Sequence, residues 1–354
     1  FFNGDEALAH VDAEGKPFWD TSCAGQQQGC PFALEGRIPA MKAQVEYFAK
    51  AYEAAGIAPD FVFADWEIDG PLEWNGAWEA SKHCERCQAN LKHIEDFREF
   101  QRTLRSIRSR LQREAYTEPL TSRFPDALVG NYAVYPNDGW RYWYDYFEDF
   151  APDNVPYRTD QKARYREWYQ EFLETGFTYG MPVVYTWYRI FDWYGFENPD
   201  YRWFYNLLMV GTNATRSAPA DLPLISFVHW HTTSPPPEPA EQVVQMSPEA
   251  YQELLWHLLL RGMDGLFLWC PSDEAPEEVR RLHEVWAASL EYRDFLAKGT
   301  PVSFEVPTWE GPVISGLQLG NRVLVRRSDF DTTTEPVMLH VAGKTLSVPP
   351  APGD

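Results

Sequence analysis

The feature that most constrains the fold is a regular alternation of short apolar runs with longer amphipathic stretches. The apolar runs have the length and composition of buried strands, and they occupy residues 61–66, 127–134, 182–187, 222–230 and 264–269. Helical spacing of apolar residues marks the stretches between and beyond them, at residues 39–56, 88–115, 161–175, around Leu207, 248–261 and 275–296. Repeated strand–helix units of this length predict a parallel sheet covered by helices.

Polar and aromatic residues follow the apolar runs at the point where each strand is expected to end. They are Asp65-Trp66-Glu67, Asn131-Tyr132, Tyr185-Thr186-Trp187, His229-Trp230-His231 and Trp269. Catalytic groups of barrel enzymes gather at the carboxyl ends of the strands, so we expect a (β/α) barrel of the TIM type, regular or distorted. No glycine-rich phosphate loop follows any run, which argues against nucleotide binding. A further candidate strand near Phe18 leaves the number of strands open.

The pattern changes after Gly299, where short alternating runs replace the strand–helix units. These runs are residues 302–306, 313–319, 322–326, 337–341 and 345–348. Gly320-Asn321 between two of the runs fits a hairpin turn. We therefore expect a barrel domain over residues 1–298 and a small antiparallel β domain over residues 299–354.

Composition excludes several kinds of partner. The formal net charge of the 354 residues is −21, whereas nucleic-acid binding needs clustered Lys and Arg. No apolar run is long enough to span a membrane. Aromatic residues make up 16% of the chain, which suits a groove that stacks on sugar rings. The chain begins at Phe1 without a signal peptide, and we interpret it as the mature or trimmed product of a secreted, periplasmic or otherwise extracellular protein. The oligomeric state stays open.

The cysteines allow two interpretations. Cys84 and Cys87 form a C-x-x-C pair, to which Cys23 and Cys30 could add two more sulfurs. A four-thiolate zinc site usually has two C-x-x-C knuckles, and the spacing from Cys23 to Cys30 is too wide for one. Disulfides that pin loops in an exported protein are therefore favoured, Cys270 is expected to be a buried free thiol, and neither a metal nor a cofactor is predicted.

The strongest chemical signal is the segment that begins with Asp65-Trp66-Glu67. On a continuous strand, Asp65 and Glu67 face the same side, and two carboxylates this close do not both ionise readily. One would then stay protonated as a general acid while the other stabilises positive charge, as glycoside hydrolysis requires. The alternatives are a solvated strand end and a metal site with Asp69 as a third ligand.

Several short segments resemble the hyaluronidase family, glycoside hydrolase family 56. They are residues 59–67 with the Asp-Trp-Glu ending, 123–136, 182–185 and 262–269. The resemblance implies that Glu67 is the general acid and that Asp65 orients the 2-acetamido oxygen of the substrate, which acts as the nucleophile. It also implies that Tyr132, Tyr185 and Trp269 line the subsite for the reacting sugar. Ile68-Asp69-Gly70 after Glu67 and the cysteine pattern depart from the family.

Other residues at the strand ends are candidates for binding a glycan. Trp187, His229 and His231 could contact the sugar, or could simply fill the core and satisfy backbone groups. Asp273 and Glu274 follow the last strand and could supply a carboxylate for a double-displacement or inverting glycosidase. A non-catalytic carbohydrate-binding barrel is the alternative outside enzymes. The sequence does not identify the sugar or the linkage.

Overall fold

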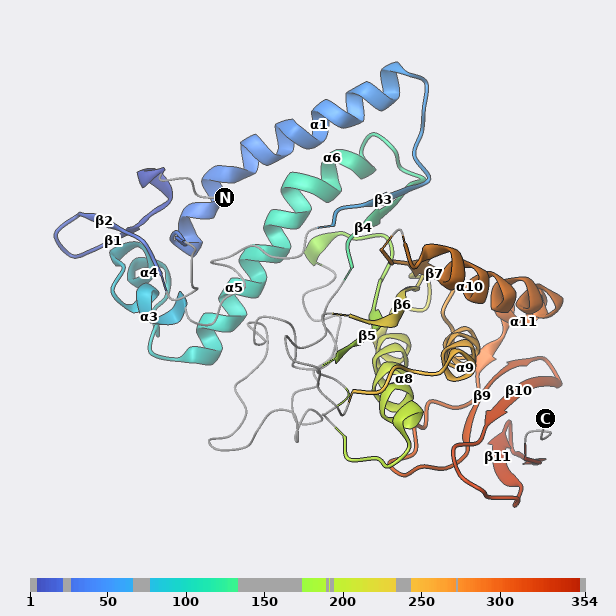
Figure 1. Cartoon of the computed structure of the whole chain (residues 1–354). Coiled ribbons are helices and arrows are strands. Elements are labelled where there is room, and N and C mark those ends of the chain that lie inside the picture. The colour runs from blue at the N-terminus through green and yellow to red at the C-terminus, as the bar shows by residue number, and fades with distance from the viewer. Residues whose placement is uncertain are drawn as a thin grey trace. The chain divides into compact units, whose positions relative to one another are not determined.

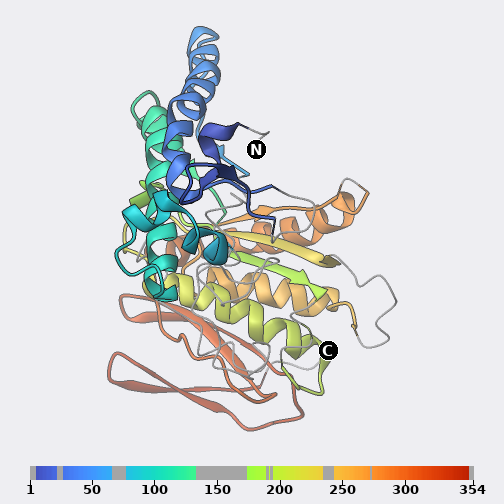
Figure 2. The same cartoon turned by 90° about the vertical axis from the view of Figure 1, so that its left-hand side faces the viewer.

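The computed structural model describes residues 5–21, 27–65, 77–132, 174–188, 191, 194–233, 243–271 and 273–350. These residues divide into two compact units, Phe1–Tyr179 and Gly180–Asp354 (Figure 1, Figure 2). Among the described helices, none has the length and apolar character needed to cross a membrane.

The first unit combines a helical layer with one pair of parallel strands. Its elements are η1 (Glu6–Leu8), β1 (His10–Val11), β2 (Pro17–Phe18), η2 (Pro31–Arg37), α1 (Ile38–Ala54), β3 (Phe61–Phe63), α3 (Ala77–Lys82), α4 (Glu85–Asn90), α5 (Phe97–Gln112), the π-helical turn η3 (Arg113–Thr117), α6 (Glu118–Thr121) and β4 (Leu128–Gly130). Helix α1 lies beside α6 in both views (Figure 1, Figure 2). A proline in the first turn of α1 and Gly56 with a φ of 70° after its end explain its limits.

Strands β3 and β4 are parallel, with Phe61 opposite Leu128 and Phe63 opposite Gly130. A core of buried side chains, among them Ala49 from α1 and Val129 from β4, packs under this pair. Gly130 allows close packing, because a Cβ atom there would lie 2.9 Å from the ring of Tyr179. The hydroxyl of Tyr116 donates to the backbone oxygen of Gly130 at 2.8 Å.

The second unit contains a three-stranded parallel sheet and two antiparallel hairpins. Its elements are β5 (Val183–Trp187), α8 (Pro199–Ser217), β6 (Ile225–Thr233), α9 (Pro248–Leu259), β7 (Gly265–Leu268), α10 (Ala275–Ser289), η7 (Leu290–Tyr292), α11 (Arg293–Lys298), β8 (Thr300–Pro301), β9 (Val313–Leu319), β10 (Arg322–Ser328), β11 (Val337–Val341) and β12 (Lys344–Val348). The parallel strands are ordered β5-β6-β7, and α8 packs on β5. The hairpins β9–β10 and β11–β12 share a small apolar core, and β9 and β10 contact α9 (Figure 2).

Within the described residues, most predicted elements are present. The predicted helix 88–115 is two helices, α4 and α5, and residues 133–160 and most of the predicted helix 161–175 lie outside the described residues. The predicted strand 302–306 is wrong, since pairing continues only to Val302 and the carbonyl of Glu305 instead accepts a hydrogen bond from Arg261. The parallel strands of the described residues form one pair and one group of three without closing into a barrel, so the barrel stays a prediction.

Candidate active site

The carboxyl ends of β5, β6 and β7 bring together three of the predicted site residues. Tyr185 on β5 lies directly opposite His229 on β6. The backbone nitrogen of Trp269, just after β7, donates to the oxygen of Val228 at 3.0 Å. The Trp269 ring meets the His229 ring edge-on at 5.0 Å and the Tyr185 ring at 6.2 Å. The expected clustering at these strand ends is therefore observed within the second unit.

His229 is buried between two carboxylates. Its Nδ1 lies 3.0 Å from Oε2 of Glu278, within ion-pair distance although the groups are not aligned as a hydrogen bond. Its Nε2 lies 3.8 Å from Oε2 of Glu274. The Glu274 side chain is 34% exposed, whereas Glu278 is fully buried. A buried carboxylate on one side and a partly exposed one on the other can orient the imidazole and link it to solvent.

Glu278 belongs to this site, although the sequence analysis did not predict it as a site residue. It lies on α10, and its Oε1 accepts the backbone N–H of Trp230 at 2.5 Å and the hydroxyl of Tyr251 at 3.3 Å. Burial raises the pKa of Tyr251 well above its ordinary value, and the nearby Glu278 carboxylate raises it further. These contacts fix Glu278, and Glu278 in turn fixes the position of His229.

Trp269 provides an accessible aromatic surface beside these acids. Its side chain is 41% exposed, although its ring packs on Phe227 and His229. An exposed indole that is held by neighbouring rings offers a rigid apolar face, which suits stacking against a sugar.

The remaining candidates near the strand ends differ in how exposed they are. Asp273 is exposed, and His231 is partly buried with its ring 4.6 Å from that of Trp230. The Trp187 backbone ends β5, but its side chain lies outside the described residues. Cys270 is partly buried rather than fully buried as predicted, and burial and then the neighbouring carboxylates raise its pKa.

In the first unit, Asp65 does not continue the strand as predicted. Strand β3 ends at Phe63, and Asp65 has a φ of 46°, in the left-handed region. The alternation that placed Asp65 and Glu67 on one face therefore stops before Asp65, because an extended chain cannot pass through that conformation. Asp65 is exposed, and Tyr132, after β4, is buried with its ring 5.7 Å from Phe63. Glu67 lies outside the described residues.

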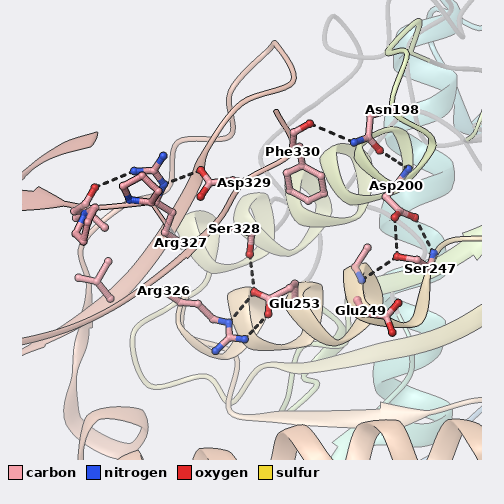
Figure 3. Close-up of a pocket in the computed structure, with 15 residues that line it drawn as sticks. Asn198, Asp200, Ser247, Glu249, Glu253, Arg326, Arg327, Ser328, Asp329 and Phe330 are labelled. Carbon is pink, nitrogen blue, oxygen red and sulfur yellow. Dashed lines mark hydrogen bonds and ion pairs between the residues drawn. The ribbon is translucent and has the colours of Figure 1, made fainter. Parts of the chain in front are cut away.

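A pocket of about 700 Å³ lies elsewhere in the second unit, between α8, α9 and β10 (Figure 3). Its polar side chains bond to one another. Asp200 accepts hydrogen bonds from the Ser247 amide and hydroxyl at 2.7 and 2.6 Å. Glu253 pairs with Arg326 and accepts the Ser328 hydroxyl at 2.6 Å. We interpret these contacts as a structural joint between helices and hairpin rather than as an active site.

The described cysteines are free thiols, so the predicted disulfides are not formed among them, and Cys23 lies outside the described residues. In the first unit, Cys30, Cys84 and Cys87 are buried together with His10, and we call these four residues the cysteine–histidine cluster. Within the described part of the chain, this is the group whose side chains could hold a metal ion. Hydrogen bonding to Cys30 and then to Cys87 lowers the pKa of the Cys84 thiol, whereas hydrogen bonding to Cys84 raises the pKa of Cys30 to about 11.

No protein-family model matches the chain, and no curated protein matches it significantly.

Proposed function

We propose that this chain is a glycoside hydrolase that cleaves an N-acetylated poly- or oligosaccharide with retention of configuration. Glu67 is the general acid and base, and Asp65 orients the 2-acetamido group of the substrate. The acetamido oxygen attacks the anomeric carbon while Glu67 protonates the leaving oxygen, and Glu67 then activates the water that opens the cyclic intermediate.

The observation that carries the assignment to glycoside hydrolases, whichever mechanism applies, is the cluster of Glu274, His229 and Glu278 in the second unit, where the half-exposed Trp269 packs on His229. The roles of Glu67 and Asp65 come from the resemblance of residues 59–67 to the hyaluronidases. Carboxylates stabilise the positive charge that develops on a sugar ring, and an indole face binds the apolar side of the ring. The cluster stands at the carboxyl ends of parallel strands, where barrel enzymes carry their catalytic groups.

The backbone of Asp65 is a second, independent support. A non-glycine residue in the left-handed region is strained by about 1 kcal/mol, and such strain concentrates at functional sites. Asp65 follows a strand of the parallel pair β3–β4 and is exposed, so its carboxylate is accessible to a ligand.

A double-displacement glycosidase is the second candidate. The partly exposed Glu274 favours it, because this carboxylate lies 3.8 Å from the imidazole of His229, on which the Trp269 ring packs. In this mechanism Glu67 protonates the leaving oxygen, and Glu274 or the neighbouring Asp273 forms the covalent glycosyl–enzyme intermediate, which water then hydrolyses; no acetamido group is needed.

A panel of neutral and N-acetylated glycans, with the product anomers followed by NMR, tests both mechanisms. Substrate assistance predicts activity on N-acetylated sugars alone, with retained configuration and a loss of about 10²–10⁴-fold in kcat for Glu67→Gln. The matched control Asp60→Asn, an exposed residue at the amino end of β3, should keep wild-type activity.

Activity on sugars that lack the acetamido group, lost in Glu274→Gln but kept in the exposed control Glu291→Gln, would replace substrate assistance by double displacement. Glycan binding by calorimetry without turnover on any substrate, unchanged in Glu67→Gln, would refute both mechanisms and indicate a binding protein.

A further inference from the structure

The cysteine–histidine cluster joins segments that are far apart in sequence. Cys30 is 54 residues from Cys84, and His10 is 77 residues from Cys87. His10 lies on β1, Cys30 precedes η2, and the C-x-x-C pair stands at the start of α4. Four side chains with metal-binding chemistry thus meet at the junction of a hairpin and two helical segments.

The distances within the cluster match a tetrahedral ion. A sulfur ligand lies about 2.3 Å from Zn²⁺, so two ligands of a tetrahedral site are separated by about 3.8 Å. Sulfur separations are 3.5 Å for Cys30–Cys87 and 3.8 Å for Cys84–Cys30, and Cys87 Sγ lies 3.9 Å from His10 Nδ1. A disulfide would need about 2.0 Å, so the sulfurs are arranged around a common centre and not in a bonded pair.

The cysteine–histidine cluster is more deeply buried than is usual for a group of polar side chains. All four side chains are fully buried, and Phe18 stacks on the imidazole at 5.0 Å. Nδ1 of His10 faces the sulfurs and lies 3.9 Å from Sγ of Cys87, whereas Nε2 has no hydrogen-bond partner among the described residues. Buried polar atoms are nearly always satisfied, and a contact of 3.9 Å to sulfur satisfies Nδ1 poorly, so a metal ion between Nδ1 and the sulfurs would supply the missing partner.

The surroundings resemble those of metal-bound thiolates. The backbone N–H of Val11 donates to Sγ of Cys84 at 3.5 Å, and such N–H···S contacts stabilise negative sulfur. Phe18, Phe32 and Ile94 pack around the sulfurs and keep water away.

We propose that the cysteine–histidine cluster binds one structural Zn²⁺ ion. Three thiolates and one imidazole are a common tetrahedral donor set for zinc, and soft sulfur ligands exclude Mg²⁺ and Ca²⁺. Because every ligand is buried, no coordination position is open to substrate, so the ion holds the β1–β2 hairpin against α4 and takes no part in catalysis. Ligand atoms that all lie within 4.8 Å of one another fit a single ion rather than an iron–sulfur cluster.

Elemental analysis of the full chain, purified without chelator, tests the site. We expect about one Zn²⁺ per chain in the wild type and in the control Cys270→Ser, whose thiol lies outside the cluster. Cys87→Ser should retain less than about a tenth of that amount. In a competition with a chromophoric chelator, His10→Ala should bind Zn²⁺ at least about 10–100-fold more weakly, since the loss of a ligand costs no less than the loss of a group that orients one.

A second measurement uses the wild type alone, in case the cysteine variants do not fold. Native alkylation followed by peptide mass spectrometry should leave Cys30, Cys84 and Cys87 unmodified until a chelator is added, after which all three should react. Co²⁺ added to the stripped protein should give the intense thiolate charge-transfer absorption of a tetrahedral site. A protein that binds neither Zn²⁺ nor Co²⁺, or a disulfide between any two of these cysteines in the unreduced protein, would overturn the proposal.

Discussion

Replacing Glu278 by alanine tests whether this buried carboxylate organises the candidate site. The change removes the acceptor of the Trp230 N–H at 2.5 Å and of the Tyr251 hydroxyl at 3.3 Å. The first bond is short and charge-assisted, so its loss costs about 2–3 kcal/mol, and the longer second bond costs about 1 kcal/mol. The one methylene that is deleted with the carboxylate adds about 1 kcal/mol.

Removal of the buried charge partly offsets these costs, because desolvation of a carboxylate is unfavourable by several kcal/mol. We therefore expect Glu278→Ala to lower the free energy of unfolding by about 2–4 kcal/mol. Glu278→Gln keeps an oxygen for the Trp230 N–H and should cost about 1 kcal/mol. Glu277→Ala, one residue earlier on the exposed side of α10, should stay within about 0.5 kcal/mol of the wild type.

Urea denaturation measures the change in the free energy of unfolding, and native-state hydrogen exchange shows which part of the chain is destabilised. At an m value of about 3 kcal/mol/M, the midpoint of Glu278→Ala should fall by about 1 M. The Trp230 amide should exchange roughly 30–1000-fold faster than in the wild type. A variant as stable as the wild type, with Trp230 exchange unchanged, would show that Glu278 desolvation cancels its bonds and that the carboxylate does not organise this strand end.

Three further changes test other parts of the structure. Asp65→Gly should raise the free energy of unfolding by about 0.5–1 kcal/mol, since glycine accepts the φ of 46° without strain, while activity is lost; Asp65→Ala should be less stable than the glycine variant in the same urea titration. Burial, followed by the positive charges of Arg261 and Arg326, lowers the pKa of His257 well below its ordinary value. Below about pH 6.5 the unfolded chain binds a proton at His257 that the folded chain does not, so the free energy of unfolding decreases as the pH is lowered. Between pH 7 and pH 5 the wild type should lose about 2 kcal/mol more than His257→Gln, and equal losses would show that His257 does not cause the pH dependence. Gly316→Ala would place a Cβ 2.4 Å from a backbone carbonyl of the facing strand, and calorimetry should show a destabilisation of about 2–3 kcal/mol, whereas an unchanged melting temperature would mean that the hairpin shifts freely.

The elements that sequence could predict are those set by local periodicity and caps. The predicted run 264–269 contains β7 (Gly265–Leu268), and the predicted helix 248–261 contains α9 (Pro248–Leu259). Ser247 caps α9 through its side chain and Pro248 starts it, which are signals within a few residues. The hairpin turn at Gly320, with a φ of 61°, was predictable for the same reason.

The conformation of Asp65 was not predictable from the same signals. An apolar run that continues to Trp66 looks like a longer strand, and nothing local marks Asp65 as left-handed. Pairing with β4 ends where that partner ends, because Ala64 donates the last bond to Gly130. The end of a strand therefore depends on its neighbour, and the neighbour lies more than sixty residues later in the chain.

The other features that could not be predicted from the sequence involve buried polar side chains. Glu278 stands in a helix turn with Glu277, Arg280 and Arg281, so local composition marks it as exposed, and only the packing of α10 against the end of β6 buries it. His10 gives no signal either, because its possible partners are spread along the chain from Cys30 to Cys87, up to 77 residues away. In both cases a polar side chain becomes informative only when burial removes water as its partner and something else must replace it. At Glu278 the replacement is visible in the Trp230 and Tyr251 bonds. At His10 the neighbouring groups are thiols, and the spacing of the four donor atoms fits a shared metal ion.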